Sequence, residues 1–440
     1  MKLTKTLLLI FGILLNFNCG EDGAPNQTSL ESEDGTSRII ARYKVESDGY
    51  FYYNPPTLVN GYIYIGTSSK LETDALATDN CFIKLDINTN LCWKYRLGKN
   101  EVRGAAVVDS KGNVYFVVVE GRGTWEDAYK QAETYLYKLD SEGQFKWKVN
   151  LATAGQIYHM GMVNPAIDEN DIIYVGGDKL YAIDPEDGKF KWEYPEGEAK
   201  MVFTNAPIID SDRNVYFIAN NKTEGENEVY SLKDGTLNWK CRLEKGFTLS
   251  SPAFNVEGNE LIAASGQTIY WIDLKNGNIK RKYTPEGITG ELRGSPAVDG
   301  ANNVFVGEKS NTNSIFFAIK ADGTGLLWSK KIGADLYSSP ALGDDGLIYT
   351  ASEDTRDGDK GKGNRFHAIN KTTGETVWAL KLEMDVTWGS AVIDENGYIY
   401  IGDMKGYFYK IKSDCSGLDP HAAWPRFRGS NEGTGRKMGK

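Results

Sequence analysis

The sequence predicts an all-β fold, an eight-bladed β-propeller made of four-stranded antiparallel blades. The first observation is a short pattern, a turn glycine followed closely by a tryptophan, that returns about every 47 residues. The second is that each repeat consists of short alternating segments separated by tight turns, without the spacing of amphipathic helices. The third is an aromatic content of 12%, with 25 tyrosines, which is typical of strand-rich proteins. Repeats of this length built from strands alone indicate propeller blades.

One repeat is read most completely at the end of the chain. Residues 389–394, 398–402 and 407–411 form three predicted strands, and Gly397 supplies the positive φ of the first turn. The fourth strand carries the tryptophan in other repeats, as in residues 190–194. Four short strands joined by tight turns make one antiparallel blade.

The repeated tryptophans are interpreted as packing residues that wedge between neighbouring blades, because a large ring recurring once per blade buries much apolar area. Stacking on a sugar or another ligand is the alternative. One repeat carries Arg281 in place of the tryptophan, and we expect Arg281 to tolerate replacement by Ala or Trp with little loss. The repeat tryptophans are Trp93, Trp147, Trp192, Trp239, Trp328, Trp378 and Trp424.

The number of blades follows from the first strands of the repeats, several of which contain the triplet Ser-Pro-Ala. Proline lacks a backbone N–H and therefore suits the start or edge of a strand. Residues 39–45 form an additional predicted strand that would complete the last blade and close the ring, with Tyr43 in the tryptophan position. Seven blades is the fallback count. The eight first strands begin near Pro55, Gly104, Asn164, Asn205, Ser250, Gly294, Ser338 and Gly389.

The repeat at residues 180–192 and the Trp-Pro-Arg-Phe-Arg-Gly tail at residues 424–429 resemble the pyrroloquinoline-quinone (PQQ)-type propeller superfamily. The resemblance covers residues 38–436 and implies one propeller domain there. The superfamily includes quinone dehydrogenases and also the non-enzymatic lipoprotein BamB of the outer-membrane β-barrel assembly machinery. The resemblance to BamB at the level of the repeats therefore implies the fold and leaves the function open.

The N-terminus has the pattern of a secretion signal. Two lysines precede a short apolar core at residues 7–15, which is too short to cross a bilayer. Cys19 follows the core as in bacterial lipoprotein signals, so we expect a signal peptide at 1–18, lipidation of Cys19, and a flexible tether at 19–37. This predicts an envelope protein anchored to the outer membrane, on its periplasmic or its surface face.

The formal net charge of −10 argues against nucleic acid as a partner, and against an anionic membrane surface as a direct partner beyond the lipid anchor. An exported protein can form disulfides, but the four cysteines other than Cys19 predict no particular pair. They are Cys81, Cys92, Cys241 and Cys415.

The enzymatic alternative is a quinoprotein oxidoreductase that binds PQQ and calcium. Resemblance to those enzymes would imply adjacent cysteines and a Glu-Asn-Asp calcium site, and the chain has no adjacent cysteines. Its three histidines, His159, His367 and His421, have no metal-pair spacing. The Asp-rich loop 354–363 is read as solvated because Arg356 interrupts its carboxylates. We therefore predict no catalytic residue, no metal and no cofactor.

Candidate binding residues come from the loops and the channel mouth. Long loops are predicted on one face, at 66–80, 119–134, 219–227, 307–315 and 352–366, and functional variation concentrates on such loops. Loop 119–134 adds Trp125 and Tyr129, which suit a protein contact. The alternative is a surface hairpin extension without a function.

Alignment of the first strands places one residue per blade at the mouth of the channel. Two arginines among aromatic rings would suit an acidic or planar group. The alternative is that Arg103 and Arg293 pair with Glu101 and Glu291, each two residues upstream. The ring comprises Tyr52, Arg103, Met162, Thr204, Leu249, Arg293, Tyr337 and Trp388, with Tyr52, Arg103, Arg293, Tyr337 and Trp388 as the candidate binding residues.

These observations favour a non-catalytic, monomeric propeller that serves as a protein-interaction scaffold at the bacterial cell envelope, as BamB does. Its partners would be other envelope proteins. The quinoprotein oxidoreductase and a surface-displayed ligand sensor or adhesin are the alternatives.

Overall fold

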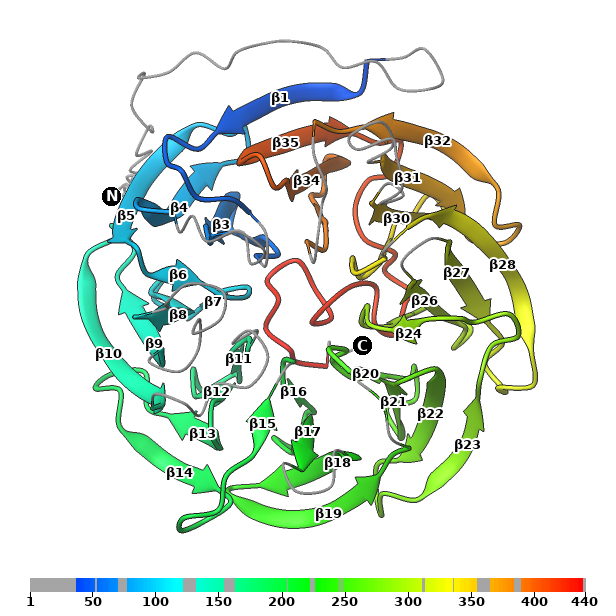
Figure 1. Ribbon diagram of the computed structural model, residues 1–440, viewed down its shortest axis with the longest axis horizontal. Helices are drawn as coiled ribbons and strands as arrows, with labels where there is room; N and C mark the ends of the chain where they lie inside the picture. Colours follow the sequence, from blue (N-terminus) through cyan, green and yellow to red (C-terminus); the bar gives the residue numbers. More distant parts are fainter. Residues whose placement is uncertain are drawn as a thin grey trace, which may run out of the picture.

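Eight antiparallel sheets form a closed ring in the computed structural model, which is an eight-bladed β-propeller (Figure 1). No helix long and apolar enough to cross a membrane occurs in the described part of the chain. The structure describes residues 37–51, 54–69, 77–121, 132–153, 163–203, 205–221, 226–244, 246, 248–310, 313–334, 336–353, 365–383 and 389–437.

We number the blades along the chain. Blade 1 contains β2 (Thr57–Val59), β3 (Tyr62–Gly66), β4 (Asn80–Asp86) and β5 (Leu91–Gly98). Blade 2 contains β6 (Glu101–Val102), β7 (Val107–Val108), β8 (Val114–Glu120), β9 (Glu133–Leu139) and β10 (Phe145–Ala152). Blade 3 contains β11 (Ala166–Ile167), β12 (Ile173–Gly176), β13 (Leu180–Ile183) and β14 (Phe190–Tyr194). Blade 4 contains β15 (Val202–Phe203), β16 (Ile208–Ile209), β17 (Val215–Asn221), β18 (Glu226–Lys233) and β19 (Thr236–Arg242).

The second half repeats this order. Blade 5 contains β20 (Ala253–Phe254), β21 (Glu260–Ser265), β22 (Thr268–Asp273) and β23 (Ile279–Tyr283). Blade 6 contains β24 (Glu291–Leu292), β25 (Ala297–Val298), β26 (Val304–Lys309), β27 (Ser314–Ile319) and β28 (Leu326–Gly333). Blade 7 contains β29 (Ala341–Leu342), β30 (Leu347–Ser352), β31 (Arg365–Asn370) and β32 (Thr376–Lys381). Blade 8 contains β33 (Val392–Ile393), β34 (Tyr398–Gly402), β35 (Tyr407–Lys412) and, from the other end of the chain, β1 (Ile39–Lys44).

Ring closure occurs in blade 8, where β1 adds to β35 as the outermost strand. The strands are antiparallel, with Tyr43 opposite Phe408 and Arg42 opposite Tyr409. The prediction of eight blades and of closure by the N-terminal strand is confirmed, and the seven-bladed fallback is wrong.

The first turn of most blades is fixed by an aspartate. The Asp109 carboxylate accepts hydrogen bonds from the backbone N–H groups of Lys111 and Asn113, and the Tyr115 hydroxyl donates to it at 2.8 Å. Short polar side chains that bond their own turn favour such conformations. The same arrangement joins Asp168 to Tyr174, Asp210 to Tyr216 and Asp394 to Tyr400.

The repeat tryptophans lie on the outermost strands and cover a glycine of the next blade. A Cβ atom added to Gly143 would lie 2.7 Å from the Trp93 ring, and the Trp93 indole N–H donates to the Ser141 carbonyl at 3.0 Å. Only glycine leaves room for the ring, and it also adopts the positive φ of this turn. The same contact joins Trp147 to Gly188, Trp192 to Gly235, Trp239 to Gly277 and Trp328 to Gly374.

Two positions depart from this pattern. Trp378 is buried, and the Arg38 guanidinium lies over its ring at 4.6 Å. Trp424 was counted among the repeat tryptophans, and this assignment is wrong. The outermost strand of that blade is β1, while Trp424 lies in the C-terminal segment and contacts Phe254, with ring centroids 5.4 Å apart.

The C-terminal segment, residues 418–437, runs through the centre of the ring (Figure 1). It exchanges backbone hydrogen bonds with the innermost strands, for example between Trp424 and Val298 and between Gly435 and Ile209. The innermost strands have no inner neighbour, so their backbone groups need partners. Because the contacts fall near the ends of these strands, the segment closes the end of the channel that carries the hairpin turns. We call this end the turn face and the opposite end the loop face.

Candidate functional site

The channel wall is held together by a belt of hydrogen bonds between neighbouring blades. The Ser251 N–H donates to the Ser295 hydroxyl at 2.9 Å, and the Ser295 N–H donates to the Ser339 hydroxyl at 2.8 Å. Ala105 donates in the same way to the Asn164 side chain, and Ser339 to Ser390. Sequence reasoning used the proline of the Ser-Pro-Ala triplets and missed this role of the serine, although its repetition was the available signal.

At the loop-face end, Arg103 and Glu101 form a fully buried ion pair. The Arg103 Nε atom donates to the Glu101 carboxylate at 2.9 Å, and neither side chain is exposed. The other Glu101 oxygen accepts the Ser69 N–H at 3.2 Å. Arg103 is therefore not available to a ligand in this structure. It pairs with Glu101, as the alternative interpretation of the sequence stated.

The second predicted arginine is paired in the same way but is less buried. Arg293 donates to Glu291 through Nε at 3.1 Å and through Nη2 at 2.8 Å, and its guanidinium lies 5.8 Å from the Tyr337 ring. Leu249 of the predicted ring is buried. The remaining ring positions lie outside the described residues; they are Tyr52, Met162, Thr204 and Trp388.

At the turn-face end, two buried arginines of the C-terminal segment bind backbone carbonyls. Arg426 donates to the carbonyls of Ala391 at 2.9 Å and of Ser390 at 3.3 Å, and Arg428 donates to that of Ala106 at 3.1 Å. Burial lowers the pKa of both guanidinium groups to about 9. Between them in the sequence, Phe427 packs against Ala105 and Ala206.

Other predicted positions divide between the described and undescribed residues. Cys81, Cys241 and Cys415 are buried free thiols. The lipidation candidate Cys19, the loop aromatics Trp125 and Tyr129, His159 and the Asp-rich loop 354–363 lie outside the described residues.

His367 lies inside blade 7, where its Nε2 atom is 2.8 Å from the Ser352 hydroxyl. Burial, followed by the charges of Arg365 and Lys330, lowers its pKa from 6.5 to about 3. In the folded state His367 therefore stays neutral at pH values at which it would bind a proton in the unfolded chain. The stabilising contribution is complete above pH 6.5 and is lost as the pH falls towards 3.

We expect the free energy of unfolding to fall by about 1.4 kcal/mol per pH unit below 6.5 because of His367. The measurement is urea denaturation at pH 7 and pH 5, with His367→Asn as the matched variant. The variant should lose about 2 kcal/mol less than the wild type between these two pH values. An identical pH dependence of the two proteins would contradict this assignment.

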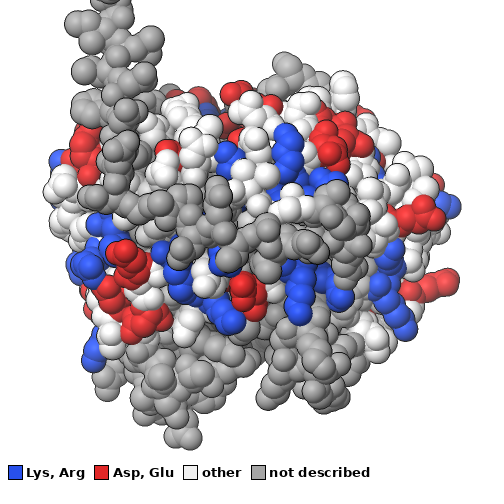
Figure 2. All heavy atoms as spheres, turned by 90° about the horizontal axis from the view of Figure 1, so that it is seen from above, with Lys and Arg blue, Asp and Glu red and all other residues white. Residues whose placement is uncertain are grey.

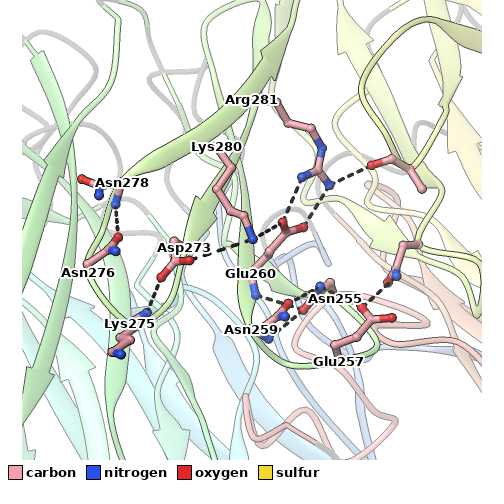
Figure 3. A network of polar contacts seen from close by, with 12 residues as sticks. Asn255, Glu257, Asn259, Glu260, Asp273, Lys275, Asn276, Asn278, Lys280 and Arg281 are labelled. Atoms are coloured by element: carbon pink, nitrogen blue, oxygen red, sulfur yellow. Dashed lines mark hydrogen bonds and ion pairs between the residues drawn. The ribbon is translucent and has the colours of Figure 1, made fainter.

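Arg281 replaces the repeat tryptophan of blade 5 and forms a network there (Figure 3). Its two Nη atoms donate to both Glu260 oxygens at 2.9 Å, and Nη2 also donates to the Ala321 carbonyl of blade 6 at 2.8 Å. Its guanidinium lies 4.8 Å from the Trp271 ring, which takes over the contact with Gly323. Burial alone would raise the pKa of Glu260, but the bonds from Arg281 and Lys280 hold it below its usual value.

These contacts argue against the expectation that Arg281 is dispensable. Arg281→Ala should lower the free energy of unfolding by about 1.5–3 kcal/mol, because charged hydrogen bonds to a buried carboxylate are lost. Chemical denaturation measures this, and Lys282→Ala is the control, since its pair with Glu244 is exposed and should cost little. Equal losses in the two variants would disprove the proposed role.

The outer rim carries a feature that sequence reasoning missed. In the described part of the chain, every strongly exposed large apolar side chain lies on an outermost strand, at its first or second residue. The signal was available, because most of these residues stand one or two places before the repeat tryptophan. They are Ile40, Phe145, Phe190, Leu237, Ile279, Leu327 and Val377.

Comparison with known proteins places this architecture among characterised propellers. The family described as outer membrane protein assembly factor BamB matches residues 54–229 and 132–379, more than half of the chain. The BamB protein of Yersinia pestis is 23% identical over 263 residues, which cover 55% of this chain and 59% of that protein. The match therefore spans less than two thirds of that relative's length.

Solved structures share the fold. BamB from Moraxella catarrhalis superposes with a TM-score of 0.56 at 15% identity, over 85% of this chain and 98% of that one. The quinohemoprotein alcohol dehydrogenase from Comamonas testosteroni gives 0.56 at 13% identity, over 85% of this chain and 76% of that chain. Because a dehydrogenase and an assembly factor superpose equally well, these two likenesses indicate the fold alone.

Proposed function

Because the chain belongs to the family of outer membrane protein assembly factor BamB, we propose that it is an exported, lipid-anchored scaffold that binds other envelope proteins. The observation that carries this proposal is the family match across most of the propeller. The ring is closed by β1 and is lined by the C-terminal segment, and its outer strands present exposed apolar side chains. A rigid scaffold with such a surface suits protein binding better than a mobile one.

The direct test is to isolate a tagged chain from crosslinked envelope membranes and to identify what is attached. We expect an outer-membrane β-barrel assembly protein at comparable stoichiometry. Isolation of the chain without envelope partners would overturn the scaffold proposal.

The quinoprotein alternative is an outcome of the same preparation. Ala105, Ala206 and Phe427 pack together in the turn-face part of the channel, and these apolar side chains offer no polar group to a quinone there. Quinone absorbance in the isolated protein, or alcohol oxidation gained on adding PQQ and calcium, would favour the oxidoreductase instead.

We expect Cys19 to carry the anchor. One acyl chain gives only marginal attachment, whereas several give stable attachment, so the lipidated chain should sediment with membranes. Cys19→Ser should abolish incorporation of labelled fatty acid and should release the chain or leave its precursor unprocessed. Equal labelling and processing of the two proteins would show that Cys19 is not the lipidation site.

A further inference from the structure

The outermost strands carry a charge opposite to that of the whole chain. The formal net charge is −10, yet each of the eight outermost strands contains at least one Lys or Arg, and together they contain a single carboxylate, Glu193. Lysines at exposed strand edges prevent edge-to-edge pairing. A cationic rim on an acidic protein also offers a surface for an anionic partner.

Around much of the ring, neighbouring carboxylates neutralise these cations. Lys148 lies 2.7 Å from Glu120, and Lys240 lies 3.0 Å from Glu228. Such pairs leave little net charge for an external partner.

The sector formed by β28, β32 and β1 differs from the rest of the rim. Within the described residues, Lys330 and Lys331 of β28 and Lys381 of β32 have no ion pair. Arg42 of β1 pairs with Glu383 at 3.4 Å and lies over the Tyr407 ring, whereas Lys44 at the end of β1 is exposed. We call these three strands the basic sector. Figure 2 shows Lys and Arg side chains across one side of the molecule, with Asp and Glu side chains among them.

Apolar side chains accompany the cations in the basic sector. Ile40 of β1 is 44% exposed, Leu327 of β28 is 45% exposed and Val377 of β32 is 51% exposed. The three strands belong to the consecutive blades 6, 7 and 8 and follow one another around the ring (Figure 1). Exposed apolar residues among cations are the combination that binds the interface of an anionic bilayer.

The position of β1 strengthens this reading. β1 is the first strand of the fold, so the chain leading from Cys19 enters at the basic sector. The stretch from Cys19 to β1 spans at most roughly 70 Å when extended, which lets this sector reach a bilayer that holds the anchor. This step depends on the lipid anchor of the proposed function.

The turn face is less suited than the rim to contact an anionic bilayer. Its hairpins are rich in carboxylates, which an anionic surface repels. A propeller lying on its turn face would bring these groups to the lipid, whereas a propeller standing on its rim would not. The exposed carboxylates of these hairpins include Glu142, Glu169, Glu186, Asp212 and Glu395.

We infer that the basic sector of β28, β32 and β1 binds the anionic headgroups of a bilayer, so that the propeller stands edge-on against the membrane. This inference differs from the expectation, drawn from the net charge, that the lipid anchor is the only membrane contact. Net charge averages over the acidic turn face and the cationic rim, which lie on different surfaces.

The test uses the mature chain exported behind a cleavable signal in place of residues 1–19, which keeps every described residue and carries no lipid. Binding is measured by co-sedimentation with vesicles of phosphatidylethanolamine and phosphatidylglycerol, and with vesicles of phosphatidylcholine alone. We expect binding to the anionic vesicles only, weakening as salt is added.

The decisive variant is Lys330→Gln, Lys331→Gln and Lys381→Gln together. Its matched control, Lys148→Gln, Lys240→Gln and Lys282→Gln, makes the same change in net charge elsewhere on the rim. The first variant should bind roughly a hundredfold more weakly, since each cation near an anionic surface contributes about fivefold. The control should bind like the parent, and both melting curves are recorded to show that the variants are folded.

Equal binding of the two variants, or equal binding to both kinds of vesicle, would overturn the inference. Loss of envelope proteins rather than vesicles in the first variant would assign the basic sector to a protein partner and would equally overturn it. Because the tested chain carries no lipid, these outcomes are independent of whether Cys19 is an anchor and of which proteins the scaffold binds.

Discussion

Replacing Arg103 by alanine is expected to lower the free energy of unfolding by about 3–5 kcal/mol, the cost of removing one member of a fully buried ion pair. The carboxylate of Glu101 would lose the guanidinium that lies 2.9 Å away, in a site where neither side chain is exposed. The Ser69 N–H, at 3.2 Å, cannot compensate for that charge. Urea denaturation monitored by tryptophan fluorescence measures the loss.

A double variant separates the charge effect from the loss of packing. Arg103→Met combined with Glu101→Gln removes both charges but keeps the volume and an acceptor for the Ser69 N–H. It should recover most of the stability, since a neutral replacement of similar shape often costs little. If Arg103→Ala is as stable as the wild type, or if the double variant is no better than the single one, the pair does not support the channel wall.

The pair of Arg103 and Glu101 also shows which part of the site could not be predicted from the sequence. The sequence placed Arg103 beside the first strand of its blade by alignment with the other repeats, and in the structure it lies between β6 and β7. Whether its guanidinium faces a ligand or Glu101 depends on side-chain direction within a two-residue strand, which a repeat alignment does not contain. The alternative of internal pairing was visible from the spacing alone, and the structure selects it for both arginines.

The blades and their closure were predictable for a physical reason. Strand alternation, turn glycines and the repeated tryptophan are local signals, and a ring that leaves no sheet edge at its seam is a general solution for such repeats. The contacts of Arg281 could not be predicted because its partner Glu260 belongs to a different strand, and the two meet only through the pairing of that blade. Exposure of the rim residues also depends on a neighbouring blade rather than on the strand itself.

The regular spacing of the repeat tryptophans led to the wrong assignment of Trp424 as one of them. Its distance from Trp378 fits the repeat, but β1 already occupies the outermost position of blade 8. The chain beyond β35 is therefore free to enter the channel, where the innermost strands offer unpaired backbone groups. Trp424 thus belongs to a segment that touches every blade rather than to one blade.

We expect Trp424→Ala to lower the free energy of unfolding by about 3–5 kcal/mol, as for a fully buried aromatic side chain. Its ring is 1% exposed and packs edge-on against Phe254 of blade 5, while its backbone exchanges two hydrogen bonds with Val298 of blade 6. Loss of the ring leaves a cavity at the point where the C-terminal segment joins these blades. Denaturation by urea, with Trp192→Ala as the comparison, measures the effect.

Trp192 is only partly buried on the outer strand, so its removal should cost roughly half as much. Proteolysis under native conditions gives a second measurement, since a loosened C-terminal segment should be cut faster in Trp424→Ala than in Trp192→Ala. If Trp192→Ala were the more damaging change, the wedges between blades would stabilise the ring more than the segment in its channel. A larger loss for Trp424→Ala would show that the eight blades depend on one shared segment at their centre, in addition to the pairing of β1 with β35.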